Sequence, residues 1–158
     1  YNYGAKNAER VKKAFRLLLT ASLCYSVTLW ALVMAVPQAF VMMFNTNEAL
    51  VSYTIPALRI YLGALLLFGI QVACQMTFTS MGNALASVIV AVVRKFVLLL
   101  PLIYIMPLIF TADKATAVFM AEPVADTIAV LFTAILFFFQ FRRFMSKMNA
   151  ADKEKTNT

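Results

Sequence analysis

Two glutamines, Gln71 and Gln75, stand four residues apart in a long apolar stretch and are the first candidates for a binding role. That spacing puts both amides on one face of an α-helix. Phe78 continues the face, and the flexible thioether of Met76 lies beside it. Amides next to an aromatic ring suit a cavity that accepts flat, amphipathic cations. A second role stays open, in which the amides only bond a neighbouring helix.

Three charged side chains, Arg59, Arg94 and Asp126, also fall inside apolar stretches. An ionised group costs free energy in hydrocarbon unless it has a partner or reaches water. We expect Arg94, about 5 Å inside the hydrocarbon edge, and Arg59 to snorkel to the headgroups. A gating ion pair is the alternative for Arg94. Asp126 is expected near the outer surface in a helix-start or packing role, with ion coupling as the alternative.

The residue types that enzymes and motors need are scarce. The chain has no histidine and only four glycines, and it contains no phosphate-binding G-x-x-x-x-G-K-[ST] loop, nucleophile elbow or metalloprotease motif. Cys24 and Cys74 lack the spacing of a metal site or a disulfide framework. We therefore predict that the protein is not an enzyme and holds no cofactor or metal.

The elements that carry these residues must lie in lipid. Hydrophobic residues make up 63% of the 158 residues and charged residues 13%, whereas a soluble domain is about half apolar and about a quarter charged. Such a chain cannot hide its apolar side chains in a water-soluble core. The net charge of +7 gathers at the two flanks, which argues against nucleic acid as a partner and for the bilayer.

Four stretches are long enough to cross the hydrocarbon core, which takes about 20 helical residues. We predict an all-α membrane protein whose four transmembrane helices span about residues 15–44, 55–81, 85–110 and 123–141. Pro56 and Pro123 fit the first turn of a helix, and Pro37, Pro101 and Pro107 predict kinks. Residues 1–149 form the membrane portion, and the polar residues 150–158 are expected to be a disordered cytoplasmic tail.

The distribution of positive charge predicts the orientation. Ten of the fourteen Lys and Arg residues lie in the two flanks, counting Arg16 at the very start of span one, whereas loops 45–54 and 111–122 hold a single lysine, Lys114. Basic flanks face the cytoplasm, so both ends are expected there. An even number of spans agrees with this placement.

Several short motifs follow one another along the chain: residues 1–7 with Arg10-Val11-Lys12, then Leu58-Arg59-Ile60-Tyr61, 75–78, Met81-Gly82-Asn83-Ala84, Arg94-Lys95, Pro101-Leu102-Ile103-Tyr104 and 121–126. In order and spacing they resemble segments of bacterial multidrug and toxic compound extrusion (MATE) transporters, most closely the MepA-like branch. The first is similar to the cytoplasmic motif after the family's eighth helix, and the others are similar to its tenth to twelfth helices. The resemblance covers nearly the whole chain.

The resemblance implies a twelve-helix transporter of two six-helix lobes that exports drugs or organic cations in exchange for Na⁺ or H⁺. This chain would be helices nine to twelve of the C-terminal lobe, in a bacterial cytoplasmic (inner) membrane, with the N-terminal lobe as its partner. Lys95 replaces the family's usual glutamine. The tenth helix lacks a deep carboxylate, so the coupling ion is expected to bind outside this segment.

Two other functions remain open from the sequence. A lipid-linked oligosaccharide flippase of the same superfamily would need a cationic cavity to hold pyrophosphate, whereas the Gln71/Gln75 face is neutral. A small four-helix scaffold or assembly protein would need no cavity at all.

Overall fold

The computed structural model describes the backbone of residues 2–5 and 7–156, and the side chains of residues 2–5 and 7–150. Within these ranges the regular structure is helical, without a strand. Four stretches are long and apolar enough to cross a membrane: Ala8–Ala35, Glu48–Ser80, Ala84–Ile109 and Lys114–Ala150. Many of their large apolar side chains are exposed, which suits a surface covered by lipid or further helices. The predicted all-α membrane fold with four spans is confirmed.

Each of the first three spans is divided into shorter helical pieces. Their bounds are α1 (Ala8–Ala35) and α2 (Pro37–Met42); α3 (Glu48–Tyr61), η1 (Leu65–Leu67) and α4 (Phe68–Ser80); and α5 (Ala84–Val92), η2 (Val93–Leu99) and α6 (Leu100–Ile109). The fourth span is the single helix α7 (Lys114–Thr156).

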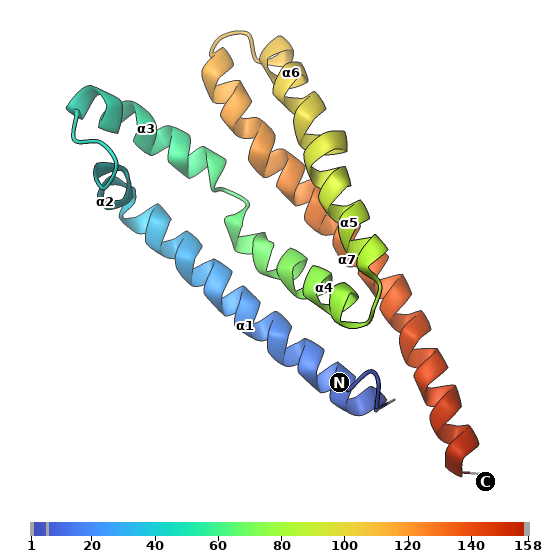
Figure 1. Cartoon of the computed structure of the whole chain (residues 1–158). Helices are drawn as coiled ribbons and strands as arrows, with labels where there is room; N and C mark the ends of the chain where they lie inside the picture. The colour runs from blue at the N-terminus through green and yellow to red at the C-terminus, as the bar shows by residue number, and fades with distance from the viewer. Residues whose placement is uncertain (1, 6, 157–158) are drawn as a thin grey trace.

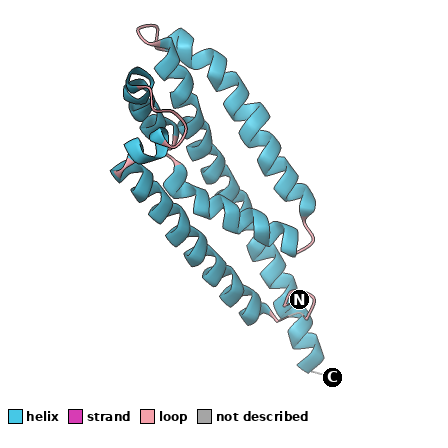
Figure 2. Cartoon of the chain, turned by 60° about the vertical axis from the view of Figure 1, so that its left-hand side comes forward, coloured by secondary structure: helices cyan, strands magenta, loops and turns pink. Residues whose placement is uncertain are grey.

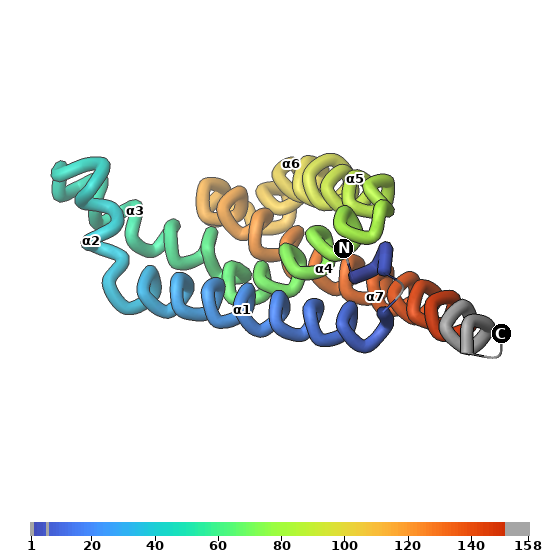
Figure 3. The backbone as a smooth tube through the Cα atoms, turned by 60° about the horizontal axis from the view of Figure 1, so that its bottom comes forward, coloured from blue at the N-terminus to red at the C-terminus, as the bar shows by residue number. Residues whose placement is uncertain are grey.

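The spans run back and forth along one bundle. Both ends of the chain lie at the same end of the bundle, and the α2–α3 and α6–α7 connections lie at the other (Figure 1). Figure 2 shows that the loops gather at these two ends, apart from the break within span two. α4 and α7 pack against each other in the middle, α1 covers α4, and η2 and α6 cover α7 (Figure 3).

An aromatic cluster holds the end of the bundle that contains the termini. The Phe137 ring of α7 lies 4.6 Å from Phe15 of α1 and 5.3 Å from Phe78 of α4, centroid to centroid. Phe141 stacks on Phe137 at 5.0 Å. Aromatic pairs at these separations stabilise beyond their buried area, so three spans are joined here.

Proline at 37 interrupts span one more strongly than the expected kink. α1 ends at Ala35, and α2 begins at Pro37 itself. Val36 between them has φ −129° and ψ 54°, because a residue before proline avoids the helical region. Pro37 therefore sits in the first turn of a new helix, where its missing N–H is harmless.

Pro56 and Pro123 are not in the first turns of their helices, contrary to the expected starts at about 55 and 123. α3 begins at Glu48 because the Asn47 side chain accepts hydrogen bonds from the first-turn N–H groups, at 3.0 and 3.3 Å. α7 begins at Lys114, where Asp113 accepts from Thr116 N–H at 3.1 Å. The side chains of Asn47 and Asp113 therefore determine where α3 and α7 begin. Both prolines are accommodated inside these helices.

The Asp113 cap lies in the loop outside the spans. Hydrogen bonds from the Thr116 hydroxyl, then from its N–H, lower the pKa of the Asp113 carboxyl from its ordinary value. A lowered folded-state pKa means that this cap stabilises the helix above the ordinary carboxyl pKa and weakens as the pH falls through the lowered value.

The far end of α7 also differs from expectation. The helix continues through Thr156, so the backbone of 150–156 is helical where a disordered tail was predicted. Extending an existing helix is easier than starting one, and this segment is rich in Ala, Lys and Glu, which favour helix. Residues 157–158 of that predicted tail lie outside the described residues.

Span two, expected as one helix over 55–81, is broken between Tyr61 and Phe68. A break in a membrane helix frees backbone groups that must find other partners. The buried Ser26 hydroxyl of α1 supplies one, because it donates to the Leu66 carbonyl at 3.1 Å. The neighbouring span thus stabilises the break.

Gly69 sits where α1 and α4 touch. A Cβ atom there would lie 2.6 Å from the Ser22 carbonyl oxygen and 2.7 Å from Ser26 Oγ. Small residues allow such close approach of membrane helices. The hydrogen bond from Ser26 to the break in span two depends on this approach.

We expect Gly69→Val in the full-length protein to separate α1 from α4 and lower the melting temperature. Overpacking of this kind costs about 1–3 kcal/mol. Thermal unfolding in detergent measures the effect, and Met76→Val, on the same helix at an exposed position, is the matched control. Equal melting of Gly69→Val and wild type would contradict the close contact.

Candidate functional site

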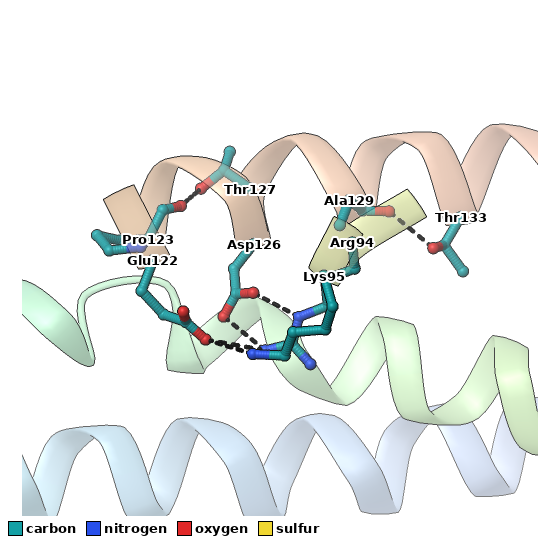
Figure 4. A network of polar contacts seen from close by, with 8 residues as sticks. All are labelled: Arg94, Lys95, Glu122, Pro123, Asp126, Thr127, Ala129 and Thr133. Carbon is teal, nitrogen blue, oxygen red and sulfur yellow. Dashed lines mark hydrogen bonds and ion pairs between the residues drawn. The ribbon is translucent and has the colours of Figure 1, made fainter. Parts of the chain in front are cut away.

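A cluster of four charged side chains lies between spans three and four (Figure 4). Arg94 makes two hydrogen bonds to Asp126: Nε to Oδ1 at 2.6 Å and Nη2 to Oδ2 at 3.0 Å. Lys95 Nζ donates to Glu122 Oε1 at 3.0 Å, and Arg94 Nη2 is 3.6 Å from the same oxygen. Two cations and two anions make this charge cluster formally neutral.

The charge cluster is well shielded. The side chains of Arg94, Glu122 and Asp126 are 17%, 11% and 14% exposed, whereas that of Lys95 is 49% exposed. The two-bond geometry of Arg94 with Asp126 is the strong arrangement for a guanidinium and a carboxylate. Lys95 makes a single hydrogen bond to Glu122 and is the most exposed member of the cluster. Arg94–Asp126 is therefore the central pair.

The cluster lies well inside the bilayer. Span three is about 39 Å long at about 1.5 Å per residue, against about 30 Å of hydrocarbon. Arg94 is about 15 Å along the helix from Ala84. It therefore lies about 6 Å inside the hydrocarbon if the Ile109 end of the span is flush with the hydrocarbon edge, and about 10 Å inside if the span is centred. Asp126, about 18 Å from Lys114, lies at a matching level on the antiparallel helix.

These contacts correct three expectations. Arg94 pairs with Asp126 of α7 and does not snorkel, so it does form an ion pair with another helix, while the gating role of that alternative stays a prediction. Asp126 is not near the outer surface, because α7 begins at Lys114 and not at Pro123. Glu122, placed in a loop by the same expectation, is a buried helical residue, and Lys95 is its partner. The four-residue spacing of Glu122 and Asp126 places both carboxylates on one helix face, and this was the sequence signal that could have revealed their pairing with Arg94 and Lys95.

Irregular backbone surrounds the charge cluster. Arg94 and Lys95 belong to η2, a π-helical turn (Val93–Leu99) that precedes Pro101. The Pro101 ring would clash with the carbonyl of Val97 in a regular helix, and the wider turn relieves that clash. π-turns occur often at functional sites.

The break in span two lies close to the charge cluster. The Arg94 guanidinium lies 5.0 Å from the centroid of the Phe68 ring, at the first residue of α4, which is cation–π range. A Cβ atom at Gly63, inside the break, would lie 3.8 Å from Pro123 Cβ. The break, the π-turn and the charge cluster are thus neighbours.

The four residues predicted to face a cavity do not share one environment. Gln71 and Phe78 are 1% and 0% exposed and lie inside the bundle. Gln75 is half-buried, and Met76 is 57% exposed. The Gln71 Oε1 atom is buried without a hydrogen-bond partner in the described structure. Of these four residues, Gln75 and Met76 are the two that can reach a cavity outside the four spans.

Arg59 lies near the opposite end from the termini and is exposed. Its Nη2 donates to the Met34 carbonyl at 3.2 Å. Met34 is in the last turn of α1, where carbonyls lack helical partners and a cation is favourable. Arg59 therefore caps α1 and takes no part in the charge cluster.

No group of three or more His, Cys, Asp or Glu side chains that could hold a metal ion occurs within the part of the chain that the structure describes.

Comparison with known families decides the identity. The family model described as MatE matches residues 1–105, well over half of the chain. The chain belongs to this family of membrane transporters. The predicted resemblance to MATE transporters is thereby confirmed, while its finer placement in the MepA-like branch stays a prediction.

Two solved structures share the fold. One, titled "protein A", is 28% identical with a TM-score of 0.79, and the match covers 87% of this chain and 30% of that one. The other is titled as the inward-facing conformation of a multidrug resistance MATE family transporter of the MOP superfamily; it is 17% identical, with a TM-score of 0.82, and the match covers 92% of this chain and 33% of that one. This chain therefore spans about a third of each of these two structures. None of the curated proteins compared with it matches.

We expect Asp126→Asn to destabilise the full-length MATE protein, since it leaves the Arg94 cation without its main partner inside the membrane. Removing one member of a buried ion pair costs about 3 kcal/mol. The double variant Arg94→Met with Asp126→Leu removes both charges and is expected to regain much of that loss.

Thermal unfolding of Arg94→Met, of Asp126→Leu and of the double variant gives the coupling free energy of the pair. Asp113→Asn is the control, because this carboxylate lies in the α6–α7 loop outside the spans. Additive effects of the two single substitutions would contradict a direct pair.

Proposed function

We propose that the parent protein exports organic compounds, cationic ones among them, in exchange for Na⁺ or H⁺. Membership of a transporter family supports transport, and the fold shared with a multidrug resistance transporter supports drugs as the substrate class. This chain forms four helices of the C-terminal lobe, which rocks against the N-terminal lobe to open a central cavity to either side in turn. The protein is not an enzyme in this proposal.

The neutrality of the charge cluster is the single observation that favours export of cations over flipping of a lipid-linked sugar. A pyrophosphate-binding cavity needs free positive charge. Here Arg94 and Lys95 are each paired with a carboxylate at 3.0 Å or less. These two cations are therefore occupied inside the chain and offer no free charge to an anionic substrate.

Gln75 and Met76 are the proposed contribution of this segment to the cavity wall. An accessible amide beside a polarisable thioether can contact varied flat cations without strict geometry. Gln71 and Phe78, initially grouped with them, are fully buried in the bundle, so we assign them to packing between α4 and its neighbours.

The proposed orientation puts both ends of the chain in the cytoplasm of a bacterium, in its inner membrane. Both ends lie at one end of the bundle, which also holds the basic residues of the two flanks. The coupling ion is proposed to bind outside this segment, since the carboxylates Glu122 and Asp126 are already engaged by cations.

We expect Gln75→Leu in the full-length transporter to lower export of a cationic fluorescent dye several-fold, because it removes an amide from the cavity wall. Gln71→Leu is the matched control: the same change on the same helix, one turn away, at a buried site. It should leave export close to wild type. Dye efflux is normalised to the amount of protein in the membrane. Unchanged export by Gln75→Leu, or a greater loss in Gln71→Leu, would refute this assignment.

Efflux should also depend on an ion gradient. In membrane vesicles with the dye loaded inside, export of the dye is expected to stop when the Na⁺ and H⁺ gradients are both collapsed and to return when the driving gradient alone is restored. Export that persists without either gradient would overturn antiport as the mechanism.

A further inference from the structure

A groove with two cations opens at the end of the bundle that holds the chain termini. It has a volume of about 560 Å³ and lies between the start of α1 and the end of α7. Its lining consists of Lys12, Phe141, Arg142, Met145, Ser146, Asn149 and Ala150. We call it the basic groove. None of the described residues that line it is acidic.

The floor of the basic groove is apolar and firmly held. Met145 is buried with Val11 and Met148 in a small cluster that Phe141 packs against. Phe141 also lies 5.3 Å from Phe15 of α1, ring centroid to ring centroid. The groove therefore combines an ordered hydrophobic floor with a positive rim, and it joins two spans.

Two helices independently locate the bilayer surface beside this groove. On α7, the exposed Phe138 and Phe139 are followed within one turn by Arg142. On α1, Arg16 is followed by the exposed Leu17 toward the interior of the bilayer. Each helix changes there from apolar to basic, which is the pattern at the edge of the hydrocarbon.

The groove lies on the headgroup side of that edge. Lys12 is about 6 Å along α1 beyond Arg16, and the headgroup layer is about 5–7 Å thick. The Arg142 guanidinium is directed back over the Phe138 ring, at 5.5 Å from its centroid. It thus lies between the exposed rings of Phe138 and Phe139, which we call the aromatic band, and the polar end of α7. This is the level at which a lipid phosphate would be.

We propose that the basic groove binds the phosphate of an anionic phospholipid from the leaflet at this end of the bundle. Lys12 and Arg142 would hold the phosphate, Ser146 and Asn149 would donate to headgroup oxygens, and the acyl chains would lie along Phe138 and Phe139. Basic pockets between membrane helices suit such headgroups. The bound lipid bridges Lys12 of the first span and Arg142 of the fourth.

The test is a lipid titration of the full-length transporter in detergent. Phosphatidylglycerol is expected to raise the melting temperature in a saturable way, and phosphatidylcholine, which has no net charge, is expected to raise it less. A basic side chain near an anionic surface contributes about a five-fold change in affinity. The double variant Lys12→Gln with Arg142→Gln should therefore bind phosphatidylglycerol about 25-fold more weakly.

The adjacent residues provide a matched control. Lys13→Gln with Arg143→Gln removes the same charge from the same two helices, at exposed positions outside the groove. It should keep the wild-type affinity within a few-fold. An equal loss in both double variants would reduce the effect to general surface charge and overturn the site, as would equal stabilisation by both lipids.

Soluble glycerol phosphate and inorganic phosphate separate a lipid from a free anion. Neither should protect the wild type against unfolding, because without acyl chains they gain nothing from the exposed aromatic band. Saturable protection by either, lost in Lys12→Gln with Arg142→Gln, would identify a soluble-anion site and overturn the lipid proposal.

Discussion

Hydrocarbon offers no hydrogen bonds, so a polar group that enters it without a partner in the protein costs free energy. The pairing of Arg94 with Asp126 is the largest consequence in this chain, because two ionised groups lie inside the bilayer and neutralise each other at 2.6 Å. The same constraint explains smaller contacts. The Thr77 and Thr133 hydroxyls donate to the carbonyls of Ala73 and Ala129, one turn earlier, at 2.7 Å each. Ser26 does the same for a carbonyl freed by the break in span two.

That constraint also shows how the irregular backbone is tolerated. The break in span two receives a hydrogen bond from α1, and its Gly63 lies close to Pro123 of α7. The π-turn of span three carries Arg94, which contacts both α7 and the first residue of α4. Departures from regular helix in spans two and three are therefore stabilised by their neighbours. Discontinuous helices near the bilayer midplane are common in transporters.

The sequence was sufficient for the spans but not for their exact bounds. Apolar runs of about 20 residues have one stable outcome in lipid, so four helices were predictable. The starts of α3 and α7 were missed because Pro56 and Pro123 are conspicuous helix-start residues, whereas the caps at Asn47 and Asp113 lie in polar segments that resemble loops. That error in α7 placed Asp126 too near the surface, so Asp126 was not predicted as the partner of Arg94.

Which side of a helix faces the core could not be obtained from spacing. Gln71 and Gln75 were correctly placed one turn apart on a helix, but Gln71 is buried and Gln75 half-buried, since the direction of the face depends on how α4 meets α1 and α7. Gly69 is the residue that fixes this meeting, through a contact that admits no side chain.

The position of the charge cluster indicates which contacts must stay intact when the lobe moves. Arg94 is held by a carboxylate on α7 and a ring on α4, so spans two, three and four are tied at one level. At that same level, the break and the π-turn leave spans two and three less constrained by helical hydrogen bonds. A segment tied at its middle and irregular around the tie can bend without exposing charge to lipid. In the proposed alternating access, a hinge that separated Arg94 from Asp126 would leave two unpaired charges in hydrocarbon.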